Sequence, residues 1–230
     1  MSKVLITGSG NGLGRHLTHE LRFHGHKIVE YDIADNALCD VRNPSTVWIN
    51  AACEGELDVL INCAGINRID WIENFSEASW DAVMDVNAKG IFKMTQACLP
   101  YLINSKGTVL NIVSNASHMP MTCSTAYNAS KGAAHIMTLQ MARELTRKYG
   151  ITVFGISPNK LRGTNMSDDI DKQVCETRGW SPEKAQEYQL AGLLAGEETS
   201  PVLLAEFIAF LLQEKSRHKF LTGCVIPYGA

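Results

Sequence analysis

The sequence lacks a long apolar run: none approaches the ~20 residues that a membrane-spanning helix needs. It also lacks a basic excess, because 21 Lys and Arg stand against 24 Asp and Glu and give a formal charge of -3. Nucleic-acid-binding proteins usually carry a basic patch. The first strand-like run starts too near Met1 to follow a signal peptide. We therefore predict no membrane segment, no nucleic-acid partner and a cytoplasmic location.

The seven cysteines are an odd number and include no Cys-x-x-Cys pair. That argues against a disulfide framework and a zinc site, so the thiols are expected to be reduced. Cys63 and Cys123 are expected near the functional pocket, with core packing as their simplest role. Potential metal ligands cluster near the first helix, but nothing else converges on them, and we interpret them as a solvated face without a metal: His16, His19, Glu20, His24 and His26.

Strand-like and helix-like segments alternate along the 230 residues, of which 45% are hydrophobic and 20% charged. We find no repeat, linker or low-complexity tract. The alternation predicts one α/β domain over residues 1–230, with a doubly wound sheet of about seven mostly parallel strands and helices on both faces.

The segment of residues 7–14 contains four glycines. It follows the apolar run of residues 4–6 and overlaps Leu13, Leu17 and Leu21, which recur at helical spacing. The pattern is a strand, a glycine turn and a helix. Glycines let the backbone approach a ligand, and the free N–H groups and positive dipole of the helix start favour a pyrophosphate. We therefore predict a dinucleotide site here, against the alternative of a plain loop.

Asp32 ends the next predicted strand, Lys27–Tyr31, eighteen residues after Gly14. A dinucleotide site has an acidic residue at this point, which binds the adenosine ribose hydroxyls. Its carboxylate would repel a 2′-phosphate, and no Arg or Lys lies in the glycine turn or directly after it. We therefore predict NAD rather than NADP as the cofactor.

A third strand is predicted at Leu38 and Cys39. Only residues 33–37 separate it from Asp32, whereas parallel neighbours normally need a crossover of about a dozen residues or more. The helix of this crossover is expected to be absent, which leaves a more open adenine pocket.

Tyr127 and Lys131 lie four residues apart, so on a helix their side chains share one face. A free Tyr titrates near pH ~10, and a neighbouring cation lowers the pKa of a phenol toward neutrality. The pair is a candidate general acid and base. The alternative is a buried Tyr beside a surface Lys.

These motifs share one register, and from Lys3 to the C-terminus the chain resembles the classical short-chain dehydrogenases/reductases. The family pattern Thr-Gly-x-x-x-Gly-x-Gly is matched at residues 7–14, and its Asn-Asn-Ala-Gly is matched at residues 62–65 with one departure at Cys63. The resemblance implies a Rossmann-like fold and an adenine contact by Asp40. The implied cofactor-binding residues are Gly8, Asn11, Gly12, Leu13, Gly14, Asp32, Asp40, Val41, Asn62, Ala64, Gly65, Tyr127, Lys131, Pro158 and Thr164.

The same resemblance implies a catalytic group of Asn87, Ser114, Tyr127 and Lys131. Hydride passes between nicotinamide and a secondary alcohol or ketone while Tyr127 transfers the proton and Ser114 binds the same oxygen. Lys131 binds the nicotinamide ribose and lowers the pKa of Tyr127. Asn87 holds a water that links Lys131 to solvent.

Two positions depart from the family pattern. Pro158 is followed by Asn159 instead of Gly, and Asn159 is expected to adopt the positive φ of that glycine. Gly163 stands where the family has the Thr that contacts the nicotinamide carboxamide, so we expect Thr164 to take its place.

Residues 164–200 form a stretch longer than a simple connection and are predicted to be a substrate lid. Ser167 and Ser181 are expected to start its two helices, and Gly179 to end the first. The candidate substrate contacts are His118, Met119, Met121, Trp180, Tyr188, Leu193 and Leu194. They leave open a steroid-like or acyl substrate and a polyol or sugar acid.

A last helix is expected to start at Ser200 and Pro201 and to pack against a last strand that runs from Lys219 to Pro227. The resemblance implies a homotetramer or homodimer. Two other function classes remain: a non-catalytic NAD-binding sensor or scaffold on the same fold, and a sugar-nucleotide epimerase or dehydratase of the extended relatives. The glycine spacing and the short C-terminal region disfavour the second class.

Overall fold

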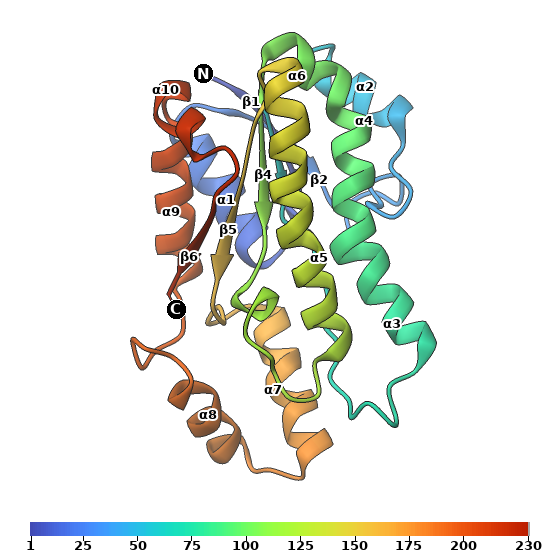
Figure 1. Cartoon of the computed structure of the whole chain (residues 1–230), viewed down its shortest axis with the longest axis vertical. Helices are drawn as coiled ribbons and strands as arrows, with labels where there is room; N and C mark the ends of the chain where they lie inside the picture. The colour runs from blue at the N-terminus through green and yellow to red at the C-terminus, as the bar shows by residue number, and fades with distance from the viewer. Residues whose placement is uncertain (230) are drawn as a thin grey trace.

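The computed structural model describes residues 1–229, and within them six strands form one parallel sheet (Figure 1). The strands stand in the order β2-β1-β3-β4-β5-β6. This confirms the predicted doubly wound α/β fold. The strand bounds are β1 Lys3–Thr7, β2 Lys27–Tyr31, β3 Val59–Asn62, β4 Thr108–Ile112, β5 Thr152–Pro158 and β6 Val225–Tyr228.

Helices cover both faces of the sheet. On one face lie α1 (Gly12–Phe23) and α9 (Pro201–Leu212), and on the other α2 (Thr46–Cys53), α4 (Gly90–Ser105) and α5 (Thr125–Met141). Single π-helical turns, Asp85–Lys89 and Ala142–Thr146, continue into α4 and α6. The other helices are α3 Glu77–Met84, α6 Arg147–Tyr149, α7 Asn165–Arg178, α8 Pro182–Ala191 and α10 Lys215–His218. No helix within residues 1–229 is both long and apolar enough to cross a bilayer.

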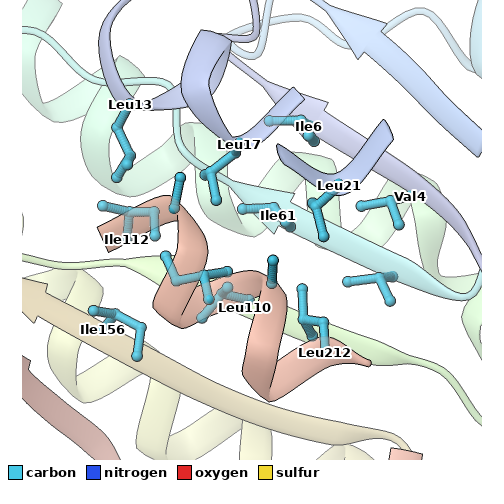
Figure 2. Packing of buried hydrophobic residues seen from close by; sticks show 14 of the residues in the cluster. Val4, Ile6, Leu13, Leu17, Leu21, Ile61, Leu110, Ile112, Ile156 and Leu212 are labelled. Carbon is cyan, nitrogen blue, oxygen red and sulfur yellow. The ribbon is translucent and has the colours of Figure 1, made fainter. Parts of the chain in front are cut away.

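The glycine turn is held in place by the core beneath α1. Leu13, Leu17 and Leu21 project from α1 toward the sheet, where Ile61 and Ile112 meet them (Figure 2). All five side chains are at most 8% exposed. Burial of such side chains contributes about 1.5–3 kcal/mol each to the stability of the fold. The leucines at the predicted helical spacing therefore hold the start of α1 at the carboxyl ends of the strands.

The third strand predicted at Leu38 and Cys39 is wrong, and the sheet therefore has six strands rather than about seven. Residues 33–39 form turns instead: the Cys39 N–H donates to the Asn36 carbonyl at 2.8 Å, and the Asn36 N–H donates to the Asp32 carbonyl at 3.0 Å. The chain between is too short to reach a pairing position beside β2, which becomes an edge strand. The expected absence of a helix between Asp32 and Leu38 agrees with these turns.

The last strand is also shorter than predicted, because residues 219–221 form a 3-10 turn and β6 begins at Val225. Gly223 has φ 78° and donates its N–H to the Val153 carbonyl at 2.8 Å, so the backbone turns at this residue before the strand begins.

The two helices of residues 164–200 lie beyond the carboxyl ends of the strands (Figure 1). Helix α7 begins earlier than predicted, because the N-cap is Thr164, whose Oγ1 accepts the Ser167 N–H at 3.1 Å. Ser181 caps α8 and Gly179 ends α7 with φ 63°, as predicted.

Candidate active site

A cavity of about 1010 Å³ opens at the carboxyl ends of the strands and is bounded on its far side by α7 and α8. Parallel strands bring their carboxyl ends to one edge: Thr7 is in register with Asn62, and Asn62 with Asn111. Most of the predicted site residues therefore line one space: Gly8, Asn11, Gly12, Leu13, Gly14, Asp32, Asp40, Val41, Ala64, Gly65, Ser114, Met119, Met121, Tyr127, Lys131, Pro158, Thr164 and Tyr188. Asn62, Asn87, His118 and Trp180 are outside its lining.

The glycine turn requires glycine at two points where chain segments meet closely. Gly8 has φ 69°, and a Cβ atom there would lie 2.9 Å from the Cα of Ala64. A Cβ atom on Gly14 would overlap the Gly8 carbonyl oxygen. Thr7 joins the same two segments, since its Oγ1 accepts N–H bonds from Cys63 at 3.0 Å and Ala64 at 3.1 Å. The turn is thus a tight cradle at the N-terminus of α1, which suits a pyrophosphate.

Asp32 and Asp40 line the part of the cavity where the sequence predicts that adenosine binds. The Asp32 carboxylate accepts the Gly10 N–H at 2.9 Å and the Ala34 N–H at 2.9 Å. Asp40 forms a two-pronged ion pair with Arg42, whose Nε lies 3.0 Å from each carboxylate oxygen, and this partner lowers the pKa of Asp40. This part of the cavity therefore presents two carboxylates, and Arg42, which also lines it, is paired with Asp40.

Tyr127 lies near the start of α5 and Ser114 two residues after β4. The Ser114 hydroxyl hydrogen-bonds the phenol and lowers its pKa, but burial raises the pKa of Tyr127 by more. The prediction that Lys131 lowers the pKa of Tyr127 is therefore not confirmed in the protein without cofactor. The reason is geometric, because the Lys131 Nζ lies 5.7 Å from the Tyr127 ring centroid and donates to the Ile112 carbonyl at 2.9 Å.

Lys131 is only 5% exposed, and burial lowers its pKa to about 8. No acid offsets that burial; the Cys63 thiol is the group that works against the shift. Gly65 lies beside the ammonium, since a Cβ there would be in ordinary van der Waals contact with Nζ, at 3.8 Å. A buried ammonium beside a phenol can stabilise a phenolate once the phenol loses its proton.

Asn87 is fully buried in the π-helical turn Asp85–Lys89. Its Oδ1 accepts the Ile66 N–H at 2.9 Å, and its Nδ2 donates to the Ile66 carbonyl at 2.9 Å and to the Ser130 hydroxyl at 3.0 Å. Side-chain atoms of Asn87 therefore hold the backbone of Ile66 in place, and the water that the resemblance assigns to Asn87 stays a prediction. π-turns often occur at functional sites.

The side chains of Asn62 and Asn159 form structural hydrogen bonds. Asn62 is buried beneath the cavity, where its Nδ2 donates to Asn111 Oδ1 at 2.9 Å. Asn159 does not have positive φ, which corrects the expectation that it replaces a glycine. Its side chain instead accepts the Thr199 N–H at 3.2 Å and donates to the Gly229 carbonyl, so it ties β5 to the end of the lid and to the C-terminus.

Among the candidate substrate contacts, Met119, Met121, Tyr188 and Leu193 line the cavity, whereas Leu194 is 90% exposed and lies outside it. His118 points to a neighbouring hydroxyl, with its Nδ1 3.1 Å from Ser117 Oγ. Trp180 packs with Ile170, Cys175 and a small buried cluster under the lid. Cys63 lines the cavity as expected, and Cys123 lies in that buried cluster.

Three residues that the sequence did not single out also line the cavity: Asn67, Arg68 and Arg178. Asn67 and Arg68 come two and three residues after the matched residues 62–65, so their place beside the site could have been predicted from the motif. Nothing in the sequence marks Arg178, which is the last residue of α7.

The cavity residues fit a nicotinamide dinucleotide. The cradle at Gly8 and Gly14, the carboxylates at Asp32 and Asp40 and the polar group of Ser114, Tyr127 and Lys131 follow one another along the same space. Residues 1–229 contain no group of three or more His, Cys, Asp or Glu side chains that could hold a metal ion.

Residues 39–174 match the family model described as short chain dehydrogenase. The chain is 30% identical to a 3-oxoacyl-[acyl-carrier-protein] reductase of Thermotoga maritima, over 96% of this chain and 94% of that protein. It is also 30% identical to a (2S)-[(R)-hydroxy(phenyl)methyl]succinyl-CoA dehydrogenase subunit of Thauera aromatica, over 97% and 93% of the two chains.

Among solved structures, levodione reductase superposes with a TM-score of 0.87 at 25% identity, covering 99% of this chain and 96% of that one. NAD+-bound xylitol dehydrogenase superposes with a TM-score of 0.91 over 100% and 98% of the chains, and its 21% identity shows the shared fold alone. Because the family model spans more than half of the 230 residues and the two relatives match almost end to end, the chain belongs to the short-chain dehydrogenases, a family of nicotinamide-dependent oxidoreductases.

Proposed function

We propose that this chain interconverts a secondary alcohol and a ketone with NAD(H), using Tyr127 as the general acid and base. The observation that carries the proposal is the half-buried phenol of Tyr127, hydrogen-bonded by Ser114 and with Lys131 one helical turn away, in the same cavity as the glycine cradle. A phenol with only a packing role would need neither group.

When bound, the nicotinamide accepts or supplies the hydride. In ketone reduction, Tyr127 gives its hydroxyl proton to the substrate oxygen, and in alcohol oxidation it takes that proton. The Ser114 hydroxyl donates to the same oxygen, so that two groups orient it and stabilise its developing charge. Lys131 stabilises the phenolate and binds the cofactor ribose, and Asn87 holds the backbone of Ile66, which lines the site.

NAD is the preferred cofactor in this proposal. Asp32 occupies the position that binds ribose hydroxyls, and a Cβ on Gly10 would lie 3.1 Å from its Oδ2 and 3.3 Å from an oxygen of Asp35, so two carboxylates stand close to the turn. A 2′-phosphate there would face like charges, and Arg42 is held by Asp40. By family resemblance, the enzyme works as a homodimer or homotetramer.

The proposal is tested with Tyr127→Phe, which removes the proton and little else. We expect the rate of hydride transfer, followed by the absorbance of reduced nicotinamide, to fall by about 10²–10⁴-fold, while NAD still binds in a fluorescence titration. Tyr101→Phe is the matched control, since its hydroxyl bonds Asn50 on α2 and lies away from the cavity.

The substrate panel contains secondary alcohols, polyols, hydroxy acids and hydroxysteroids, each with NAD and with NADP. Survival of activity in Tyr127→Phe would contradict the mechanism. Faster turnover with NADP would contradict the role of Asp32. Binding of NAD by the wild-type protein without turnover of any substrate would favour a sensor or scaffold.

A further inference from the structure

The substrate end of the cavity contains a buried hydrogen-bond donor with no acceptor. Asn67 is 3% exposed, and its Oδ1 accepts the Arg68 N–H at 2.7 Å. That bond fixes the amide orientation, because a flipped amide would set one donor against another. The Nδ2 group of Asn67 is buried and has no partner within the described chain. An unsatisfied buried donor costs about 1–3 kcal/mol, so its retention beside a cavity needs an explanation.

Arg178 supplies a second such donor. Its guanidinium lies 4.6 Å from the ring centroid of Trp180 and 4.8 Å from that of Tyr188, which hold it in place by cation–π contacts. One Nη2 bond to the Thr122 carbonyl is long, at 3.4 Å. Its Nε is buried and unpartnered. Over residues 1–229, no carboxylate forms an ion pair with Arg178.

The remaining charges at this end do not neutralise Arg178. Arg68 also lines the cavity, and its Nη1 donates to the Asn67 carbonyl at 2.8 Å. Lys160 is already balanced by Asp171 at 2.6 Å and Glu198 at 2.8 Å. Asp169 is the acid of α7 that lines the cavity, and it is exposed, so solvent screens it.

We propose that the substrate carries an anionic group, which the Asn67 amide and the Arg178 guanidinium hold at the lid end of the cavity. This inference rests on the proposed function and names its substrate class. A carboxylate or phosphate accepts several hydrogen bonds and would satisfy both orphaned donors, whereas a neutral hydrocarbon or ester would leave the half-exposed Arg178 guanidinium without a counter-charge and its buried Nε without an acceptor. Of the substrate classes that the sequence left open, the acids are favoured over neutral steroids and polyols.

Three probes separate the sources of the charge: acetoacetate carries a free carboxylate, its methyl ester is neutral, and acetoacetyl-CoA carries its charge on the phosphates of the carrier. Each is titrated into the wild-type protein with NAD present and followed by calorimetry, so that binding is measured whether or not hydride is transferred. We expect at least one anionic probe to bind ten-fold or more tighter than the ester.

Arg178→Gln and Asn67→Asp should each lower the ratio of anion affinity to ester affinity by about 10–100-fold, the range expected for a hydrogen bond to a charged group. Arg178→Lys keeps the charge and should lose less. Arg147→Gln, an exposed arginine of α6, is the control. Circular dichroism and the unfolding midpoint show whether each variant is folded.

A preference for acetoacetate that both variants remove assigns the charge to the substrate itself, and a preference limited to acetoacetyl-CoA assigns it to the carrier. Equal affinity of the ester and both anions, or an affinity ratio that neither variant changes, would overturn the inference. Because binding and hydride transfer are read separately, a protein that selects anions but transfers no hydride would refute the proposed function and leave this inference standing.

Discussion

Replacement of Lys131 by Met should abolish catalysis and at the same time stabilise the fold. Burial lowers the pKa of Lys131 from 10.5 to about 8, and no acidic side chain compensates for the burial. A shift of about 2.5 units at about 1.4 kcal/mol per unit makes the charged side chain destabilising by about 3 kcal/mol. Met is unbranched, apolar and similar in length, so it removes that cost and fills the same space.

The effect has a defined pH dependence. Between pH 8 and 10.5 the unfolded chain binds the Lys131 proton and the folded chain has released it, so the stability of the wild-type protein rises with pH in this window. Below pH 8 the cost is fully present. The destabilisation by Lys131 is about 3 kcal/mol at pH 7 and about 2 kcal/mol at pH 9. In the Met variant, loss of the hydrogen bond to the Ile112 carbonyl reduces the gain in stability by about 1 kcal/mol at both pH values.

Urea unfolding of Lys131→Met and wild type without nucleotide measures this difference. We expect the variant to be more stable by about 2 kcal/mol at pH 7 and by about 1 kcal/mol at pH 9. Lys27→Met, at a surface position of β2, is the control. A variant less stable than wild type at pH 7, or a gap that stays the same at both pH values, would refute the reasoning.

Two further predictions test other parts of the site. Thr7→Val removes the acceptor of the Cys63 and Ala64 N–H groups, so it should lower the free energy of unfolding by about 1–3 kcal/mol and weaken NAD binding. Urea unfolding and nucleotide titration measure the two effects, with Thr46→Val at an exposed position as the control; normal stability and binding would mean that Thr7 does not hold the turn. Burial raises the pKa of Tyr127, and alcohol oxidation needs the phenolate, so the rate of oxidation should increase with pH through the alkaline range. The rate of ketone reduction, which needs the phenol, should not increase. An oxidation rate that declines from pH 7 to 9 would argue against Tyr127 as the base.

The parts of the site that the sequence predicted are those set by local motifs at strand ends. Gly8 follows β1 directly, Gly14 lies in the first turn of the helix after it, and Ser114 comes two residues after β4; a parallel sheet brings such positions to one edge whatever the rest of the chain does. The contacts that the sequence did not predict join distant segments. Arg178 reaches Thr122, 56 residues away, and Asn159 reaches Thr199 and Gly229. The pKa of Tyr127 belongs to this second kind, because burial depends on every element around the phenol.

The third strand, which was predicted but does not form, is a different case, because the sequence contains a turn pattern that indicates its absence. Asp32, Asn36 and Asp40 recur every four residues, and each accepts the N–H two positions ahead, on Ala34, Leu38 and Arg42, at 2.9, 3.0 and 2.9 Å. Asp and Asn favour turns by this bond.

Three such turns in succession leave no extended stretch that could pair with β2. One contact holds the loop in place of strand pairing, because the Tyr31 hydroxyl donates to the Leu38 carbonyl at 3.2 Å. The Tyr31 ring is itself packed edge-on against Trp48 of α2, at 5.2 Å. Residues 39–42 of this loop line the end of the cavity where we propose that adenosine binds. The carboxylates of Asp32 and Asp40 are therefore held by the same side-chain bonds that replace the strand, and this end of the cavity depends on local turns rather than on the sheet.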